Sequence, residues 1–270
     1  MSLQVIIITG ASDGIGAELA RQLARRHQKR IALVLAARSA DKLAAVAQAC
    51  QASGAHVMVR PTDVGIESEC RGLIAEAISR FGRIDTLVNN AGMSAHAQLE
   101  EVQDMAWYEQ LMRINLWGSA WCTHAALPHL KTSRGLIVAV SSLAGLVGVP
   151  GRTAYSCTKF AMNGFFEALR VEMKPHGVGV TIAYPGVVAT EIRYRGFDAQ
   201  GCAAGKSGLD ERGAMSVESC AALILRGMDR RQRDIVMTAQ GKLSRWMKLL
   251  APGLVDRLAL AALKKQGHPH

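Results

Sequence analysis

A tyrosine and a lysine four residues apart carry the clearest chemical signal in this sequence. Tyr155 and Lys159 occupy positions i and i+4 of a predicted helix, so their side chains share one face. A nearby ammonium group stabilises the phenolate and lowers the tyrosine pKa from about 10, which lets the phenol exchange protons near neutral pH. Ser142 ends a predicted strand, from which its hydroxyl can reach the phenol. Tyrosine and lysine at this spacing also occur on solvent-exposed helices, an alternative that the pair alone leaves open.

Three glycines follow the first predicted strand in a pattern that suits a dinucleotide. Residues 9–16 read Thr-Gly-Ala-Ser-Asp-Gly-Ile-Gly and lead into a helix. Gly10 permits a tight turn, Gly14 lets the backbone approach a pyrophosphate, and Gly16 lets the helix pack on the strand. The helix N-terminus would face the negative charge. The same turn could also be only a structural elbow.

The elements that must position these residues follow an alternating pattern. Short β-branched runs alternate with segments of helical periodicity, which predicts a parallel sheet with helices on both faces. The expected strands are 5–9, 32–36, 56–60, 86–89, 136–141, 179–183 and 234–237, and the expected helices are 16–27, 41–52, 67–81, 107–130, 154–174 and 217–230. The sequence therefore predicts an α/β fold, with a single doubly wound Rossmann-type domain of seven parallel strands over residues 1–240 and an extension over 241–270.

Composition excludes several classes of protein. Of the 270 residues, 49% are hydrophobic and 20% are charged, as in ordinary globular domains. The longest apolar run, 31–37, is too short to cross a bilayer, and the first strand begins so early that we expect no signal peptide and a cytoplasmic protein. Six cysteines without a Cys-x-x-Cys pair favour reduced thiols and no metal site.

The charge balance is strongly basic. Lysine and arginine outnumber acidic residues by 32 to 22, a net charge of +10, which could serve nucleic acid or an anionic membrane. Many of these cations fall where helices should end, as do Arg25 and Arg26, and there they complement the helix dipole. We therefore expect no nucleic-acid partner.

These motifs together resemble the short-chain dehydrogenase/reductase family. The glycine turn, Asn89-Asn90-Ala91-Gly92, Asn115, Ser142, Tyr155, Lys159 and Pro185-Gly186 occur in the family's order and spacing. The resemblance extends to about Met237 and is nearest to the hydroxysteroid and lipid dehydrogenase branch. It implies a nicotinamide cofactor and hydride transfer between that cofactor and a ketone or secondary alcohol.

The resemblance also implies roles for individual residues. Tyr155 would be the general acid for reduction and the general base for oxidation, and Ser142 would bind the reacting oxygen. Lys159 would contact the nicotinamide ribose, while Asn115 would hold a water that connects Lys159 to solvent. The expected cofactor-binding residues are Gly10, Ser12, Gly14, Ile15, Gly16, Arg38, Asp63, Asn90, Ala91, Gly92, Tyr155, Lys159, Pro185, Gly186, Val188 and Thr190.

The end of the second predicted strand favours NADP(H) over NAD. An NAD site places a carboxylate there for the ribose hydroxyls, and Ala37 offers none. Arg38 beside it presents a planar cation that suits a 2′-phosphate. Asp13 weakens this argument, because many NADP-using relatives carry a base at that position, and Arg38 could instead merely cap the strand.

The remaining segments leave substrate and partners open. We expect residues 192–214, rich in glycine and charge, to form a mobile loop over the substrate. In the basic amphipathic extension, Leu243, Trp246, Met247 and Leu250 predict one helix, Pro252-Gly253 a break, and Leu254, Val255, Leu258 and Leu263 a second helix. This extension would close the substrate pocket and hold a homodimer or homotetramer, with peripheral membrane contact as the alternative. A regulatory NADP-binding protein, or one that binds through its basic surface, is the alternative function.

Overall fold

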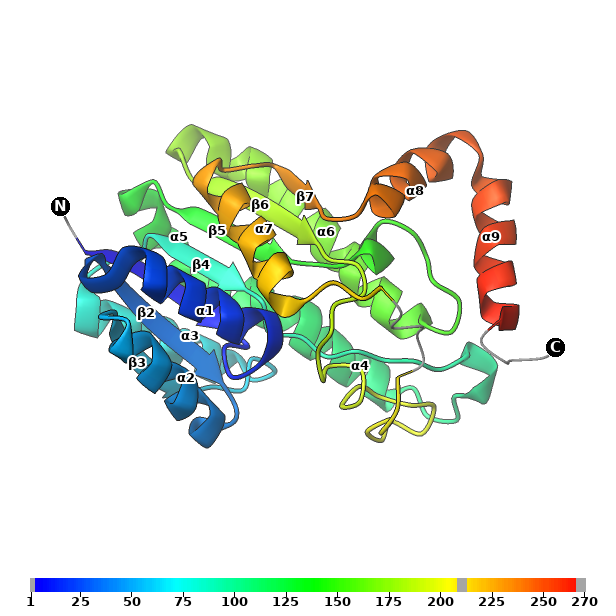
Figure 1. Ribbon diagram of the computed structural model, residues 1–270, viewed down its shortest axis with the longest axis horizontal. Helices are drawn as coiled ribbons and strands as arrows, with labels where there is room; N and C mark the ends of the chain where they lie inside the picture. The colour runs from blue at the N-terminus through cyan, green and yellow to red at the C-terminus, as the bar shows by residue number, and fades with distance from the viewer. Residues whose placement is uncertain (1–2, 208–212, 266–270) are drawn as a thin grey trace.

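The structure is a computed structural model that describes residues 3–207 and 213–265, the last four without side chains (Figure 1). Its centre is a sheet of seven parallel strands in the order β3-β2-β1-β4-β5-β6-β7. The strands are β1 (Gln4–Thr9), β2 (Ile31–Ala37), β3 (His56–Pro61), β4 (Thr86–Asn89), β5 (Leu136–Val140), β6 (Gly179–Tyr184) and β7 (Asp234–Val236). The sheet confirms the predicted doubly wound Rossmann-type architecture.

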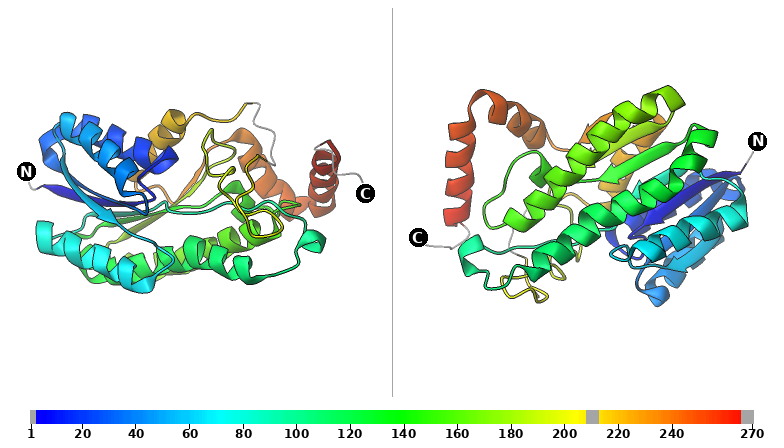
Figure 2. Two further views of the ribbon diagram at one scale, coloured as in Figure 1. Left: turned by 90° about the horizontal axis from the view of Figure 1, so that it is seen from below. Right: turned by 180° about the vertical axis from the view of Figure 1, so that it is seen from behind.

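Helices cover both faces of this sheet. They are α1 (Gly14–His27), α2 (Ala40–Ala52), α3 (Glu67–Phe81), α4 (Ala106–Met112), α5 (Gly118–Ser133), α6 (Thr153–Met173), α7 (Val217–Asp229), α8 (Ala239–Leu250) and α9 (Pro252–Lys265). The buried side chains of α1, α2 and α7 pack on one face, and those of α3, α5 and α6 pack on the other (Figure 2). Strands buried on both sides read as continuous apolar runs, which explains why β2 is apolar along its whole length.

The carboxyl ends of the strands meet along one edge of the sheet. The chain order reverses between β1 and β4, which are neighbours in the sheet although β2 and β3 separate them in sequence. In doubly wound folds ligands bind outside the carboxyl ends at this point. The glycine turn, Arg38, Asp63, residues 90–92, Ser142 and residues 185–190 all follow strands at this edge, whereas Asn115, Tyr155 and Lys159 lie on helices.

One expected helix differs from its prediction. Residues 107–130 were expected to form a single regular helix, but a π-helical turn, Arg113–Trp117, separates α4 from α5. Gly118 N–H bonds the carbonyl of Arg113, five residues back, so the turn holds one residue more than a regular helix. Asn115 lies in this wide turn and is fully buried. The chain stays helical on both sides of this turn, so helical periodicity predicts one element over these residues and does not show the extra residue.

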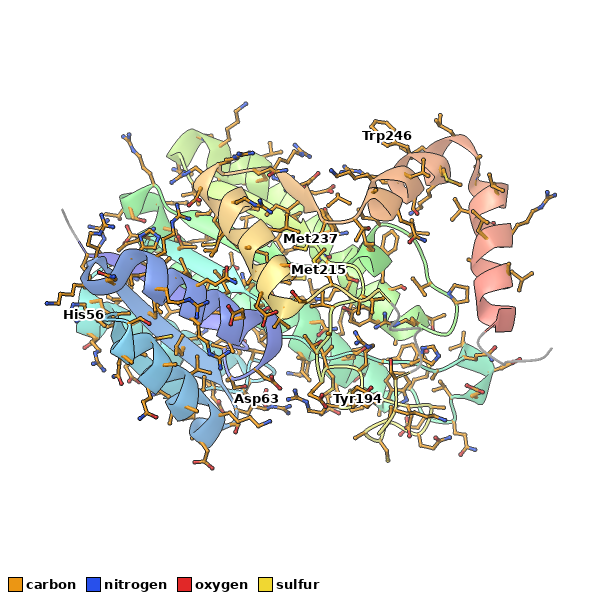
Figure 3. The ribbon with its side chains drawn as sticks, viewed as in Figure 1. His56, Asp63, Tyr194, Met215, Met237 and Trp246 are labelled. Carbon is orange, nitrogen blue, oxygen red and sulfur yellow. The ribbon has the colours of Figure 1, made fainter. Side chains whose placement is uncertain are left out.

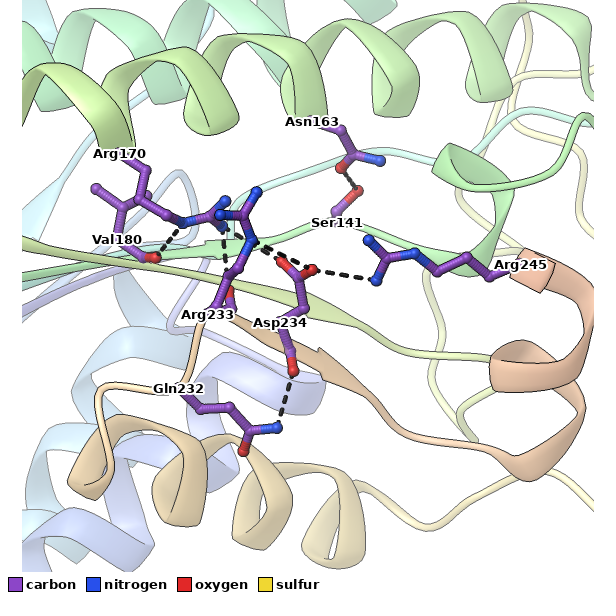
Figure 4. A network of polar contacts seen from close by, with 8 residues as sticks. All are labelled: Ser141, Asn163, Arg170, Val180, Gln232, Arg233, Asp234 and Arg245. Carbon is purple, nitrogen blue, oxygen red and sulfur yellow. Dashed lines mark hydrogen bonds and ion pairs between the residues drawn. The ribbon is translucent and has the colours of Figure 1, made fainter. Parts of the chain in front are cut away.

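The extension forms α8 and α9, which stand at the side of the molecule away from the N-terminus (Figure 1). Arg245 of α8 pairs with Asp234 of β7 at 3.1 Å, and Arg170 of α6 bonds the same carboxylate at 3.3 Å (Figure 4). One carboxylate therefore joins the sheet edge, the α6 helix and the extension. Within the described ranges, no helix combines the length and apolar character that crossing a bilayer requires. The boundary at residue 240 falls inside α8 and stays a prediction.

Candidate active site

The glycine turn has the backbone geometry that its sequence requires. Gly10 and Gly14 have φ angles of +66° and +53°, a region that side chains disfavour. A Cβ on Gly16 would lie 2.4 Å from the carbonyl oxygen of Gly10, so α1 packs on the turn without room for a side chain. The methyl of Thr190 lies 3.1 Å from where a Gly14 Cβ would be, so residues 185–190 face the turn. The N-terminus of α1 and its glycines form a cradle that fits a dinucleotide pyrophosphate.

A cavity of about 1270 Å³ runs along the carboxyl edge of the sheet. Its volume exceeds the roughly 300–1,000 Å³ of an ordinary small-molecule site, which leaves room for a dinucleotide and a substrate together. Of the predicted site residues, all but Gly16 and Asn115 line this cavity. Those two lie behind its wall, where they position the lining residues. Among the residues with described side chains, no cluster of histidine, cysteine and acidic groups could hold a metal ion.

The three predicted proton-transfer residues meet in the cavity wall. Tyr155 and Lys159 are 8% and 3% exposed on the N-terminal part of α6, and the Lys159 Nζ atom lies 5.8 Å from the centre of the phenol ring. Lys159 Nζ also donates to the carbonyl of Val140, at the end of β5, over 3.0 Å. Ser142 follows that strand, and its hydroxyl is one of the groups that lower the pKa of Tyr155. The end of β5 and the start of α6 thus bring together residues that are 13 positions apart.

The electrostatics of this group favour an acidic phenol. Burial raises the pKa of Tyr155, but the charges of Lys159 and Arg152 and hydrogen bonds with Ser142 and Arg152 outweigh it, so the pKa lies below its ordinary value. Burial also lowers the pKa of Lys159, against the attraction of Tyr155. Both shifts move the two groups toward titration closer to neutral pH.

Asn115 uses its side-chain amide within the protein. Its Oδ1 accepts from the N–H of Met93 at 2.8 Å, and its Nδ2 donates to the Met93 carbonyl and to Thr158 Oγ1, each at 3.0 Å. The amide therefore joins the segment after β4 to α6. Its carbonyl accepts from the Ser119 hydroxyl at 3.3 Å. Both Oδ1, which accepts one bond, and this carbonyl oxygen keep a lone pair that could bind a water between Lys159 and solvent, and that role stays a prediction.

The end of β2 offers a cationic corner. Arg38 is exposed, lines the cavity and makes no hydrogen bond or ion pair with any described residue. Ser39 occupies the N-cap position of α2, but its hydroxyl accepts no hydrogen bond from the first turn of the helix. Lys42, in that first turn, lines the same cavity. The neighbouring Asp13 carboxylate accepts from Gly14 N–H at 2.7 Å and pairs with Arg195. Burial raises the pKa of Asp13, but these contacts and the charge of Lys42 outweigh it, so the pKa lies below its ordinary value and Arg195 neutralises the ionised carboxylate.

The other expected cofactor contacts lie along the same edge. Asp63 follows β3, as Figure 3 shows, and its Oδ1 accepts from Gly65 N–H at 2.9 Å. Asn90 donates through Nδ2 to the carbonyls of Thr9 and Gly10, at 3.0 and 3.1 Å, so its amide supports the glycine turn. The backbone of residues 90–92 then passes along the cavity wall.

One side of the cavity is apolar and is partly formed by the extension. Its apolar lining includes Leu143, Leu146, Val147, Val149, Leu243, Met247, Val255 and Leu258. In the loop 192–214, Phe197 is 8% exposed, forms a β-bridge with Ala95, and its ring lies tilted against that of Trp107, with 5.6 Å between the ring centres. The described part of this loop is therefore anchored to the body at Phe197, and its mobility stays a prediction.

The apolar face expected for α8 is only partly buried. Leu243 and Met247 reach the cavity, but Trp246 and Leu250 are 64% and 82% exposed, and Figure 3 shows Trp246 on the outer side of the helix. Polar contacts instead hold α8, because Lys248 donates to the Leu146 carbonyl at 3.0 Å and Arg245 pairs with Asp234. The side chain expected at Leu263 lies outside the described residues.

Several site residues were not found from the sequence. Arg152 lies against Tyr155, Ser39 and Lys42 extend the cationic corner, and Arg195 covers Asp13. Ser39 and Lys42 adjoin Arg38 on a helix N-terminus, which is a readable signal. No sequence signal pointed to Arg152 or Arg195, because isolated arginines in loops are ordinarily exposed.

Comparisons with known proteins agree with this geometry. Residues 4–200 match the family model described as short chain dehydrogenase. The chain is 36% identical to a protein named 11-beta-hydroxysteroid dehydrogenase A from Sesamum indicum, over 98% of this chain and 77% of that protein. It is 44% identical to 11-beta-hydroxysteroid dehydrogenase-like 4A from Arabidopsis thaliana, over 68% of this chain and 61% of that protein.

Solved structures show the same fold. An alcohol dehydrogenase from Thermococcus sibiricus, complexed with 5-hydroxy-NADP, has a TM-score of 0.75 at 27% identity, over 87% of this chain and 96% of that one. A short chain dehydrogenase/reductase from Burkholderia phymatum, in complex with NAD, has a TM-score of 0.80 at 23% identity, over 94% of this chain and 95% of that one. This chain therefore belongs to the short-chain dehydrogenase/reductase family of oxidoreductases.

Proposed function

We propose that the protein is an NADP(H)-dependent oxidoreductase that interconverts a ketone and a secondary alcohol, with Tyr155 as the general acid and base. The observation that carries this proposal is the buried group of Tyr155, Lys159 and Ser142 in the wall of a cavity that also contains the glycine turn. A regulatory protein on the same fold would have no need of a buried, cationic environment around one phenol.

Each residue of this group has a different role in proton transfer. The nicotinamide cofactor, when bound, supplies or accepts the hydride. In reduction, the Tyr155 phenol gives its proton to the substrate oxygen while the Ser142 hydroxyl hydrogen-bonds that oxygen. In oxidation, the phenolate takes the alcohol proton. Lys159 stabilises the phenolate and lies where it can also contact the nicotinamide ribose.

The cationic corner supports a preference for NADP(H). Arg38, Ser39 and Lys42 all line the cavity at the N-terminus of α2, a combination that suits a doubly charged 2′-phosphate. The sequence objection from Asp13 loses force, because Arg195 neutralises that carboxylate. Asp63 remains the proposed partner of the adenine ring.

The apolar substrate side supports a bulky, apolar alcohol or ketone. Two of the relatives compared above are named hydroxysteroid dehydrogenases, and the lining from Leu143 to Leu258 offers a steroid-like molecule mainly hydrocarbon contacts. We also propose that the exposed leucines and Trp246 of α8 and α9 meet a second copy of this chain in a homodimer or homotetramer.

Incubation of the purified protein with NADPH and a panel of ketones, aldehydes and steroids tests the proposed reaction. Loss of the reduced-nicotinamide absorbance is expected with wild-type protein and not with Tyr155→Phe. If NADPH binds tightly and no member of a broad panel is reduced, while the corresponding alcohols are also not oxidised with NADP⁺, the regulatory alternative is favoured.

A further inference from the structure

Arg152 is a buried arginine that lies against the catalytic phenol. It is the N-cap residue of α6 and is only 9% exposed. Its Nε donates to the carbonyl of Ala95 at 3.2 Å, and its Nη2 donates to Ser94 Oγ at 2.7 Å. These bonds hold the guanidinium carbon 4.1 Å from the centre of the Tyr155 ring. The segment after β4 thus fixes a cation on the phenol.

The charges around this arginine are unusual. A buried cation is costly and is ordinarily paired with a carboxylate. Among the described residues no acidic group forms an ion pair with Arg152, and its fixed partners at residues 94 and 95 are neutral. Burial lowers the pKa of Arg152, which Arg193 also lowers and Tyr155 raises.

The other ionisable groups that the structure describes near the phenol are also not acidic. Lys159 lies on the same helix, Arg193 faces Arg152 from the loop 192–214, and the His96 ring packs against Gly151. Among the described residues around Tyr155, its own phenolate is therefore the negative charge that can offset Arg152.

We propose that Arg152 is a positioning residue that orients Tyr155 and, together with Lys159, stabilises its phenolate form. This inference rests on the proposed role of Tyr155 in proton transfer. The two cations act from different sides: Lys159 is one helical turn further along α6, and Arg152 is one turn before the phenol. Arg152 needs no contact with substrate to have this effect.

The sign of the effect on pH dependence follows directly. Removing the cation destabilises the phenolate, so the Tyr155 pKa rises. Oxidation needs the phenolate, so the rising limb of its kcat/KM profile should move to higher pH by about one unit. Reduction needs the neutral phenol, so its activity should persist to higher pH. A purely structural role would lower activity at every pH without moving either limb.

Three variants separate charge from structure. Arg152→Gln keeps amide donors for Ser94 and the Ala95 carbonyl but removes the charge, and it should show the full shift. Arg152→Lys keeps the charge and should stay within about 0.3 units of wild type. Arg80→Gln is the matched control, because it removes a guanidinium 5.4 Å from the Phe81 ring on α3, far from the site, and should change nothing.

Spectroscopic titration makes the test independent of turnover. The ultraviolet absorbance of phenolate is followed against pH, and the same curve for Tyr155→Phe is subtracted, which leaves the titration of Tyr155 alone. The midpoint should rise by about one unit in Arg152→Gln. Because no substrate is needed, failure of the proposed function and failure of this inference give different results.

A second variant covers the case in which Arg152→Gln does not fold. Ser94→Ala removes one anchor of the guanidinium and keeps its charge, so the midpoint should rise by about half as much. An unchanged Tyr155 titration midpoint in a folded Arg152→Gln protein contradicts the proposal. If Arg152→Gln does not fold, an unchanged Tyr155 midpoint in Ser94→Ala contradicts it. A Tyr155 midpoint raised equally by Arg152→Lys and Arg152→Gln also contradicts it, because the charge would then not be the cause.

Discussion

The glycine turn and the C-terminal helices differ in what determines their conformation. At the turn, backbone packs on backbone, and a single Cβ at Gly16 would come within 2.4 Å of a carbonyl oxygen. In α8 and α9, large apolar side chains such as Trp246 and Leu250 are mostly exposed, and ion pairs and a lysine–carbonyl bond hold α8 to the body. A site formed by close backbone contacts requires particular residue types in the sequence. Exposed apolar helix faces require only an amphipathic sequence pattern.

The group of Tyr155, Lys159 and Ser142 in the cavity wall resembles the glycine turn in this comparison. Tyr155 and Lys159 are buried on α6, whose far end is tied to β7 by Arg170 and Asp234 (Figure 4). The helix thus has little freedom to move relative to the sheet. If catalysis and cofactor binding depend on the glycine turn and α6, substitutions there should have large effects. Changes in α8 and α9 should then alter activity and substrate affinity only modestly.

The largest effect is expected from Tyr155→Phe, which removes the transferable proton and keeps the ring. Turnover should fall by about 10²–10⁴-fold, while the Kd for NADPH, measured by fluorescence titration, should stay nearly unchanged. Lys159→Ala should instead damage both turnover and cofactor binding. If Tyr155→Phe keeps most of its activity, the proposed mechanism is wrong.

Two helical glycines test the backbone argument. Gly16→Ala should cost about 1–3 kcal/mol of unfolding free energy and impair cofactor binding, because the new methyl meets backbone. Gly164→Ala, in α6 with nothing within 4 Å of its Cβ position, should be stabilising by about 0.5–1 kcal/mol. Urea unfolding with and without NADPH measures both. Equal behaviour of the two variants would show that the close approach at the turn has no energetic consequence.

Arg38→Ala tests the cationic corner. NADPH binding should weaken by about 1.5–3 kcal/mol, because a charge-assisted contact with the 2′-phosphate is lost, and NADH binding should not change. The ratio of kcat/KM values for the two cofactors measures this. Equal losses with both cofactors would mean that Arg38 acts on the structure and not on the phosphate.

Deletion of the residues after Ala239 is expected to have the smallest effect on catalysis. The KM for an apolar ketone should rise by up to about tenfold, or ~1.4 kcal/mol, because the deletion opens one side of the cavity. The solution mass should fall to that of a monomer. Light scattering, steady-state kinetics and co-sedimentation with anionic vesicles measure these outcomes. Unchanged mass and turnover with lost vesicle binding would favour a membrane-facing extension.

Local requirements made most of the fold and the centre of the site predictable. β1, β2 and β5 are largely apolar because the sheet is buried on both faces, and the turn requires glycine because a side chain there would be strained or would meet neighbouring atoms. Tyr155 and Lys159 share a helical face by spacing alone. For these features the chain's own periodicity and steric limits determined the outcome.

Tertiary structure decided the features that depend on residues distant in sequence. The placement of Arg152 on Tyr155 requires residues 94 and 95, more than fifty positions away, and the neutralisation of Asp13 requires Arg195. The π-helical turn at Asn115 and the exposure of Trp246 likewise follow from how segments pack. The sequence determines the charge and length of each side chain. Its partner depends on which elements pack together in the folded chain, and burial then determines the strength of that contact.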